Sequence, residues 1–158
     1  MSLDLADSDE NVFAWPFGYI EQRPVVRSLG ERDLYLGNKF AASPERHDRR
    51  FEFVLSATHE PYPLTTHHRP LADGPDNNWS TFESAVDTAR ALYRRDGSVL
   101  VHCKAGISRS TTLVATTLAA EEGHQLRAAL DIVHEARPRA MPNPALHEQA
   151  VVYLAAHS

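Results

Sequence analysis

The 158-residue sequence contains a single cysteine, Cys103, which excludes an internal disulfide framework and suits a reducing compartment. No apolar run approaches the ~18 residues that a membrane-spanning helix needs. The first ten residues are acidic, whereas a signal peptide begins with basic residues. A net charge of -5 lacks the positive excess typical of general nucleic-acid binding. We therefore expect a cytoplasmic protein without a membrane span and without general nucleic-acid binding.

A recognisable metal-binding motif is also missing, although the sequence has 9 histidines. His67 and His68 are neighbours, so on a strand they face opposite sides and cannot readily chelate one ion. His147 is followed by Glu148 but lacks the second histidine of a zinc-protease helix. His124 and His134 fit exposed positions on helices. The sequence thus predicts no metal and no cofactor.

The length and the 42% hydrophobic content suit one domain with a substantial core. Residues 1–30 read as an N-terminal tail and an aromatic-rich segment, which is expected to be irregular between Asn11 and Leu29. Residues 31–158 form the expected domain, without repeats or an interdomain linker.

Alternating strand-like and helix-like patterns follow within that domain. Strands are predicted at residues 33–37, 51–56, 67–71 and 99–101. Helices are predicted at residues 80–95, from about Arg109 to Glu122, around Leu126 to Val133, and from Asn143, an N-cap followed by proline. The alternation predicts an α/β fold: a single domain with a central, mostly parallel or mixed sheet flanked by helices.

The most informative stretch joins the short apolar run Val99-Leu100-Val101 to the helix that begins near Arg109. A seven-residue loop between them allows backbone N–H groups to converge on one point, so the loop is a candidate anion site. The substrate-binding residues predicted for this loop are Lys104, Ala105, Gly106, Ile107, Ser108 and Arg109.

Cys103 lies at the floor of the loop, where converging N–H groups and the helix N-terminus favour a thiolate. Arg109 offers a planar fork able to hold two oxygens of a phosphoryl group. Ser110 is placed to stabilise the sulfur as a leaving group, and His102 to hydrogen-bond the loop backbone. Together they predict a phosphate-binding loop with a nucleophilic cysteine.

The pattern His102-Cys103-x-x-Gly106-x-x-Arg109-Ser110 resembles the signature of cysteine-based protein tyrosine phosphatases, and residues 105–110 resemble the dual-specificity branch. The resemblance covers roughly residues 34–153. It extends to Leu34-Tyr35-Leu36-Gly37 and to the C-terminal pattern formed by Arg137-Pro138, Pro142-Asn143, Leu146, Gln149 and Tyr153. Leu146 departs from this pattern, since an aromatic residue is usual there. The resemblance implies hydrolysis of phosphomonoesters through a phosphocysteine intermediate.

Such a mechanism needs a general acid that later acts as a base. The resemblance places it about thirty residues before the nucleophile, which favours Asp73. Asp76 remains the alternative, although an aspartate there is also a favoured cap for the following helix.

The resemblance implies protein substrates carrying phosphotyrosine, phosphoserine or phosphothreonine. Phosphoinositides and RNA 5′-phosphates remain alternatives, but Ile107 is apolar where a second basic residue would help to bind several phosphates. The short segment before Asp73 predicts a small substrate-recognition loop. A second hypothesis is a module that binds phosphorylated partners without turnover, which the intact set of Cys103, Arg109 and Asp73 disfavours. Sulfur transfer and arsenate reduction are disfavoured by the order of Asp73 before Cys103.

Overall fold

The computed structural model describes residues 11–12 and 20–158. The predicted acidic tail and most of the aromatic-rich segment lie outside these residues. At the N-terminal end, β1 (Asn11–Val12) pairs antiparallel with β2 (Ile20–Glu21). Within the described ranges, no helix is long and apolar enough to cross a membrane.

The central sheet has the strand order β3-β4-β7-β5-β6 in the described part of the chain. Its strands are β3 (Val26–Ser28), β4 (Leu34–Gly37), β5 (Phe53–Ser56), β6 (His67–His68) and β7 (Val99–His102). The edge strand β3 pairs antiparallel with β4, and every other pairing is parallel. The predicted α/β fold with a mostly parallel, mixed sheet is therefore confirmed.

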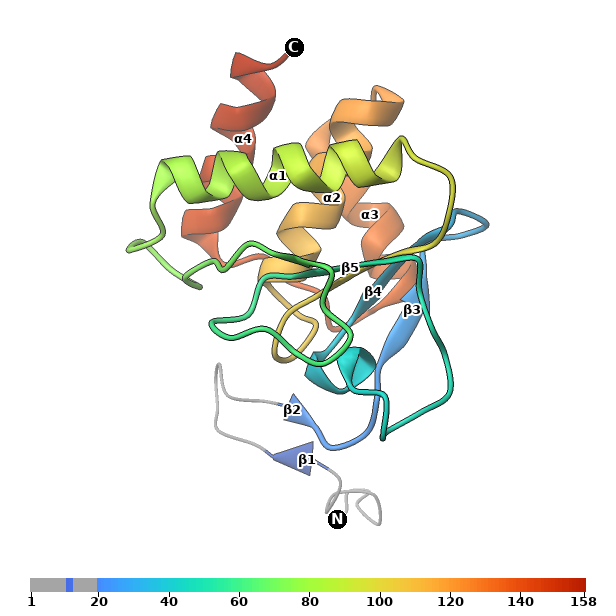
Figure 1. Ribbon diagram of the computed structural model, residues 1–158. Coiled ribbons are helices and arrows are strands. Elements are labelled where there is room, and N and C mark those ends of the chain that lie inside the picture. Colours follow the sequence, from blue (N-terminus) through green and yellow to red (C-terminus); the bar gives the residue numbers. More distant parts are fainter. Residues whose placement is uncertain (1–10, 13–19) are drawn as a thin grey trace.

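The long helices lie on one side of the sheet, and the short 3-10 helix η2 (Lys39–Ala42) lies on the other (Figure 1). The long helices are α1 (Trp79–Tyr93), α2 (Arg109–Glu122), α3 (Leu126–Ala136) and α4 (Pro144–Ala156). Helix α2 contacts the other three and also packs on β7 and β4. Its residues from Ser110 to Ala119 are all buried, as expected of a central helix.

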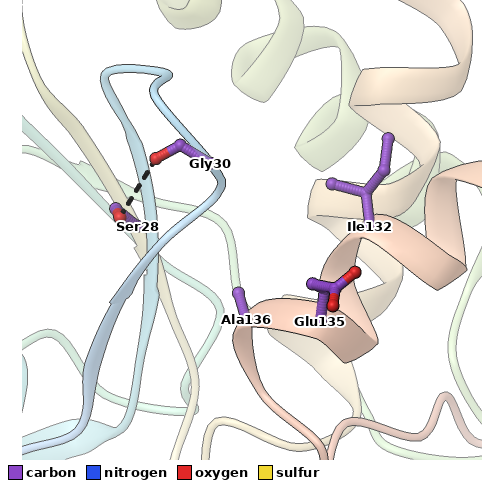
Figure 2. A pocket seen from close by; sticks show the side chains of 5 residues that line it. All are labelled: Ser28, Gly30, Ile132, Glu135 and Ala136. Atoms are coloured by element: carbon purple, nitrogen blue, oxygen red, sulfur yellow. Dashed lines mark hydrogen bonds between the residues drawn. The ribbon is translucent and has the colours of Figure 1, made fainter.

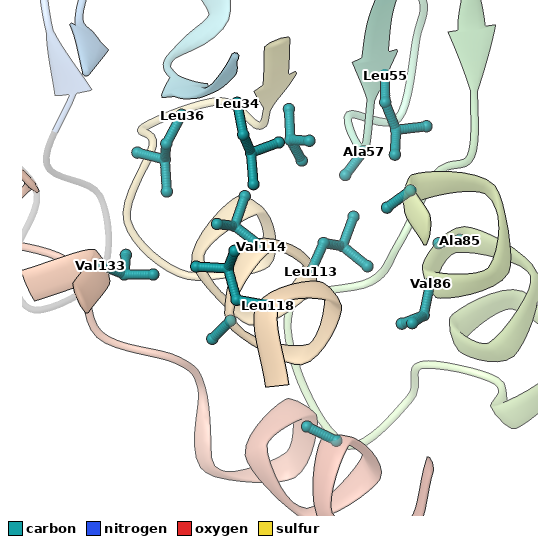
Figure 3. Packing of buried hydrophobic residues seen from close by; sticks show 14 of the residues in the cluster. Leu34, Leu36, Leu55, Ala57, Ala85, Val86, Leu113, Val114, Leu118 and Val133 are labelled. Carbon is teal, nitrogen blue, oxygen red and sulfur yellow. The ribbon is translucent and has the colours of Figure 1, made fainter. Parts of the chain in front are cut away.

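Alternation along the strands divides the apolar residues between the two faces of the sheet. Leu34 and Leu36 belong to the main core beneath the helices, whereas Tyr35 packs in the smaller cluster on the η2 side. Figure 3 shows Leu34, Leu36 and Leu55 directed toward Leu113 and Val114 of α2. Leu146, the departure from the family pattern, is fully buried in this core.

The parallel strands end together at one edge of the sheet. Gly37 of β4 and Ser56 of β5 are both in register with His102 of β7. The loop that begins at Cys103 therefore leaves the centre of the sheet at its carboxyl edge, where binding sites of open α/β sheets lie.

Three local expectations differ from the structure. Residues 11–29 are expected to be irregular, but they include the paired strands β1 and β2. Val26–Ser28 also forms an edge strand, because its backbone pairs with β4. The strand predicted at residues 67–71 is only His67–His68. Helix α1 is capped by Asn78, whose side chain accepts from Ser80 N, so the capping role considered for Asp76 is wrong.

The division of the chain between residues 30 and 31 stays a prediction. Leu29 precedes it but is fully buried in the main core, and β3 belongs to the same sheet.

Candidate active site

The active-site loop, residues 103–109, links β7 to α2 as the sequence pattern indicates. Cys103 is 2% exposed, and its Sγ lies 3.1 Å from Ser110 Oγ. Backbone N–H groups of Ile107 and Ser110 also hydrogen-bond the sulfur. The sulfur thus faces hydrogen-bond donors from the loop and from the first turn of α2.

The carbonyl groups of residues 103–107 point away from the sulfur. Each accepts a hydrogen bond from outside the loop: Cys103 O from His102 Nδ1 (3.3 Å), Lys104 O from Lys39 N (3.1 Å), Ala105 O from Arg137 Nη2 (3.1 Å), Gly106 O from Arg137 Nε (3.2 Å) and Ile107 O from Met141 N (2.8 Å). In a trans peptide the N–H points opposite to the C=O. The N–H groups of residues 104–108 are consequently directed inward, as an anion-binding loop requires.

Two glycines allow the loop to approach β4. Gly106 has a φ of +70°, and a Cβ there would lie 3.0 Å from the Gly37 carbonyl. A Cβ on Gly37 would in turn lie 2.6 Å from Val25 O. Any larger residue at position 106 would be strained by its backbone conformation and would displace the loop.

Burial raises the pKa of the Cys103 thiol, but the charge of Arg109 and the hydrogen bonds from Ser110 and from Ile107 N–H outweigh it. The net result is a pKa below that of an ordinary thiol. These groups favour the thiolate, the form of cysteine that acts as a nucleophile.

His102 is fully buried beside Cys103. Burial is the main cause that lowers its pKa to about 4, so the ring is neutral near pH 7. Since Cys103 O can only accept, His102 Nδ1 carries the hydrogen and Nε2 accepts from Ser56 Oγ at 2.6 Å. Ser56 Oγ lies 2.6 Å from Thr65 Oγ1, which accepts from Tyr62 N. This chain of hydrogen bonds connects the loop after β5 to the backbone of Cys103.

Arg109 begins α2 and is partly buried. Its Nη1 donates to Leu71 O (3.3 Å) and Ala57 O (3.4 Å), which holds the guanidinium beside the loop. A cleft of about 210 Å³ opens next to it, lined by Thr58, His59, Glu60, Tyr62, Lys104 and Arg109. The short segment after β5 therefore supplies one wall of the candidate site.

Asp73 also reaches the loop. Its Oδ1 accepts a hydrogen bond of 2.6 Å from Ser108 Oγ, and its backbone carbonyl accepts one of 3.0 Å from Asn143 Nδ2. Asn143 also caps α4 through Ala145 N, and its own N–H donates to Ser108 Oγ. By contrast, the Asp76 side chain is exposed and has no hydrogen-bond partner among the described residues. The structure thus joins Asp73 to the loop by a hydrogen bond and, among the described residues, shows no such bond for Asp76.

Several residues around the loop were not singled out from the sequence. Ser56 extends the His102 chain, and Arg137 binds two loop carbonyls. Glu21 pairs with Arg137 at 2.8 Å. Arg137 belongs to the C-terminal pattern quoted above, but that pattern did not indicate what Arg137 binds. Ser56 and Glu21 carry no local signal, because their partners are distant in sequence.

Other features lack the groups of a catalytic site. A cavity of about 360 Å³ lies between the β3–β4 turn and α3 (Figure 2), lined by Ser28, Gly30, Ile132, Glu135 and Ala136. No nucleophile stands beside a base there. Across the described ranges, no cluster of three or more His, Cys, Asp or Glu residues is arranged to hold a metal ion.

In a comparison with known protein families, residues 34–155 match the sequence model of the family described as the dual specificity phosphatase catalytic domain. Dual specificity protein phosphatase 1 of Arabidopsis thaliana is 36% identical over 126 residues, covering 75% of this chain and 64% of that protein. Human dual specificity protein phosphatase 15 is 33% identical over 123 residues, covering 73% of this chain and 42% of that protein. The crystal structure of human DUSP28 superposes with a TM-score of 0.71 at 26% identity, covering 85% of this chain and 97% of that one.

The chain thus spans less than two thirds of the length of these two curated relatives. The matched region nevertheless contains the whole active-site loop, Asp73 and Asn143.

Proposed function

The chain belongs to the dual-specificity phosphatase family, and from that premise we propose that it hydrolyses phosphomonoesters through a phosphocysteine intermediate. The observation that carries the proposal is the loop that begins at Cys103: the carbonyls of residues 103–107 are bound on its outer side, while the N–H groups of Ile107 and Ser110 hydrogen-bond Cys103 Sγ. A phosphoryl group has the charge and size to occupy such a loop.

In the first step, the Cys103 thiolate attacks phosphorus, so that an S–P bond forms as the P–O bond to the leaving group breaks. Arg109 binds two of the non-bridging oxygens with its planar fork, and the inward N–H groups bind the rest. Asp73, held by Ser108 at the mouth of the loop, donates a proton to the departing oxygen.

In the second step, water attacks the phosphocysteine. The Asp73 carboxylate takes a proton from that water, the S–P bond breaks, and inorganic phosphate forms. The sulfur leaves as a thiolate, which the Ser110 hydroxyl at 3.1 Å stabilises. His102 and Asn143 support the site by holding the Cys103 carbonyl and the Asp73 backbone.

The proposed substrates are proteins that carry phosphotyrosine, phosphoserine or phosphothreonine. Family membership supports this class. Among the loop residues, Lys104 adds one cation, whereas Ile107 is apolar where a substrate with several phosphates would need another. Phosphoinositides and RNA 5′-phosphates are therefore the weaker alternatives.

We further propose that residues 31–158 are the catalytic domain and that the protein acts in the cytoplasm. A single cysteine that must stay reduced to react supports a reducing compartment.

The test is turnover of an aryl phosphate in the presence of EDTA, with Cys103→Ser as the inactive control. Wild type should turn over without added metal, and the variant should not. Failure of wild type to turn over, with retained binding of a phosphopeptide, would favour the non-catalytic binding module. A panel of phosphopeptides, phosphoinositides and 5′-phosphorylated RNA then identifies the substrate class, and preference for either of the last two overturns the protein assignment.

A further inference from the structure

Arg137 lies directly behind the active-site loop. It is 3% exposed, and it follows α3 as its C-cap. Its Nε donates to Gly106 O at 3.2 Å and its Nη2 to Ala105 O at 3.1 Å. One guanidinium therefore fixes two successive peptide groups of the loop.

The consequence for the nucleophile follows from peptide geometry. The carbonyl of Gly106 and the N–H of Ile107 belong to one planar trans peptide and point in opposite directions. Because Arg137 holds that carbonyl from outside, the Ile107 N–H is directed inward, where it hydrogen-bonds Cys103 Sγ. The orientation of one sulfur ligand is thus set by a side chain on the far face of the loop.

A buried guanidinium is stable only when its charge is balanced. Glu21, which is 9% exposed, supplies the balance through Oε1 at 2.8 Å from Arg137 Nη1. The backbone of this segment is itself held, because Asn38 Nδ2 donates to Arg23 O at 2.9 Å. Glu21 therefore reaches Arg137 from a fixed position.

We propose that Glu21 and Arg137 form a positioning pair, in which a carboxylate from the N-terminal segment holds the arginine that aims the loop N–H groups at Cys103. The inference rests on the proposed function, since the aim of those groups matters only if Cys103 is the nucleophile. It adds Glu21 to the machinery of the site, although this residue precedes the matched family region.

Other charged or titratable groups lie near Cys103 or near the Glu21–Arg137 pair. Arg109 and His102 lie beside Cys103, and Tyr62 packs on His102 with ring centroids 5.5 Å apart. Asp73 reaches the loop through Ser108. Arg23 Nε lies 3.9 Å from Glu21 Oε2 but is 54% exposed, so it is the weaker of the two partners of Glu21. None of these is altered in the test that follows.

The test compares wild type with Glu21→Gln, using the rate of Cys103 alkylation by iodoacetamide as a function of pH. This readout reports the thiolate and needs no substrate. Neutralising Glu21 should let Arg137 shift from the loop carbonyls, so the alkylation midpoint should rise by about one pH unit. Alkylation below the midpoint should then slow roughly tenfold. The acidic limb of kcat/KM for an aryl phosphate should move by the same amount.

Glu122→Gln is the matched control. Glu122 binds Arg32 with two hydrogen bonds of 2.8 Å at the far end of α2. The control should leave the alkylation midpoint of Cys103 unchanged, because it breaks an ion pair that does not contact the loop. A shift as large in Glu122→Gln as in Glu21→Gln would mean a general loss of structure and would overturn the proposal.

If Glu21→Gln does not fold, Glu21→Asp keeps the charge on a shorter side chain, and its midpoint must still rise. A folded variant with the wild-type midpoint overturns the positioning pair. The alkylation midpoint of wild-type Cys103 separates failure of the proposed function from failure of this inference. A midpoint typical of an ordinary thiol rejects the proposed function. A low wild-type midpoint that no Glu21 variant changes rejects only the positioning pair.

Discussion

The Ser108 hydroxyl donates a hydrogen bond of 2.6 Å to Asp73 Oδ1. Ser108 is the N-cap residue of α2, yet its side chain does not cap that helix. The first N–H groups of α2 are therefore left for the sulfur and for an incoming anion. Ser108 thus joins Asp73, the proposed general acid, to the helix that faces Cys103, the proposed nucleophile.

Replacing Arg109 by lysine should reduce kcat by about 10²-fold or more, because a lysine keeps the charge but loses the bidentate fork. The carbonyls of Ala57 and Leu71 would also lose their shared donor. Steady-state kinetics with an aryl phosphate measures the effect. Arg127→Lys, an exposed change on α3, is the control and should retain wild-type kcat. Near-normal turnover by Arg109→Lys would contradict the assigned role.

The low pKa of His102 predicts a pH-dependent stability. Its pKa is 6.5 ordinarily and about 4 in the folded protein, chiefly because of burial. As the pH falls through 6.5, His102 becomes protonated in the unfolded chain. In the folded protein the same ring stays neutral until about pH 4. The free energy of unfolding should therefore fall by about 3 kcal/mol as the pH is lowered from 6.5 to about 4. Below about pH 4 the contribution of His102 should change no further.

Urea denaturation at several pH values between 7 and 4 measures this loss. In His102→Gln the ring is absent, so the pH dependence should be smaller even if the variant is less stable at pH 7. Glu122, whose pKa is about 2 because of its hydrogen bond to Arg32, contributes its own loss only below about pH 4.5. Equal slopes for wild type and His102→Gln above pH 4.5 would refute the prediction.

Thr111 should be replaceable with a gain in stability. It is fully buried, and its Oγ1 has no hydrogen-bond partner among the described residues. Thr111→Val removes the unpaired hydroxyl and keeps the shape, so the free energy of unfolding should rise by about 1 kcal/mol. Thr117→Val is the control, since Thr117 Oγ1 donates to Leu113 O at 2.7 Å, and it should give no gain. Equal gains in both variants would show that the missing partner is not the cause.

The strand, loop and helix around Cys103 could be predicted from the sequence because their signals are local. Three apolar residues precede the loop, and a glycine with positive φ stands within it. The helix spans then follow from apolar periodicity. The fold class needed little more, since alternating strands and helices favour parallel pairing.

What surrounds the loop could not be predicted in the same way. Ser56 meets His102 and Glu21 meets Arg137 across separations of 46 and 116 residues, which only the tertiary fold determines. The strand β3 could not be predicted either, because a short edge strand is stabilised by pairing with its neighbour, here β4, rather than by its own residue pattern. The roles of the site residues remain predictions for the experiments described here.

The choice between Asp73 and Asp76 can be made by leaving-group chemistry. A general acid matters most when the departing oxygen is strongly basic, as in an alkyl phosphate. Asp73→Asn should therefore slow hydrolysis of a phosphothreonine peptide by about 10²-fold to 10⁴-fold, and that of a nitrophenyl phosphate much less. Asp76→Asn is the matched control: it removes the same charge from the same turn, at an exposed side chain that makes no hydrogen bond to the described residues.

The pH–rate profile gives a second, independent readout of the same pair of variants. The optimum requires Cys103 ionised while the acid is still protonated, so its basic limb should report the acid. Asp73→Asn should lose that limb, whereas Asp76→Asn should keep it. If Asp76→Asn instead shows the leaving-group dependence and Asp73→Asn behaves like wild type, the roles are exchanged. The hydrogen bond from Ser108 to Asp73 would then serve only to hold the turn in place.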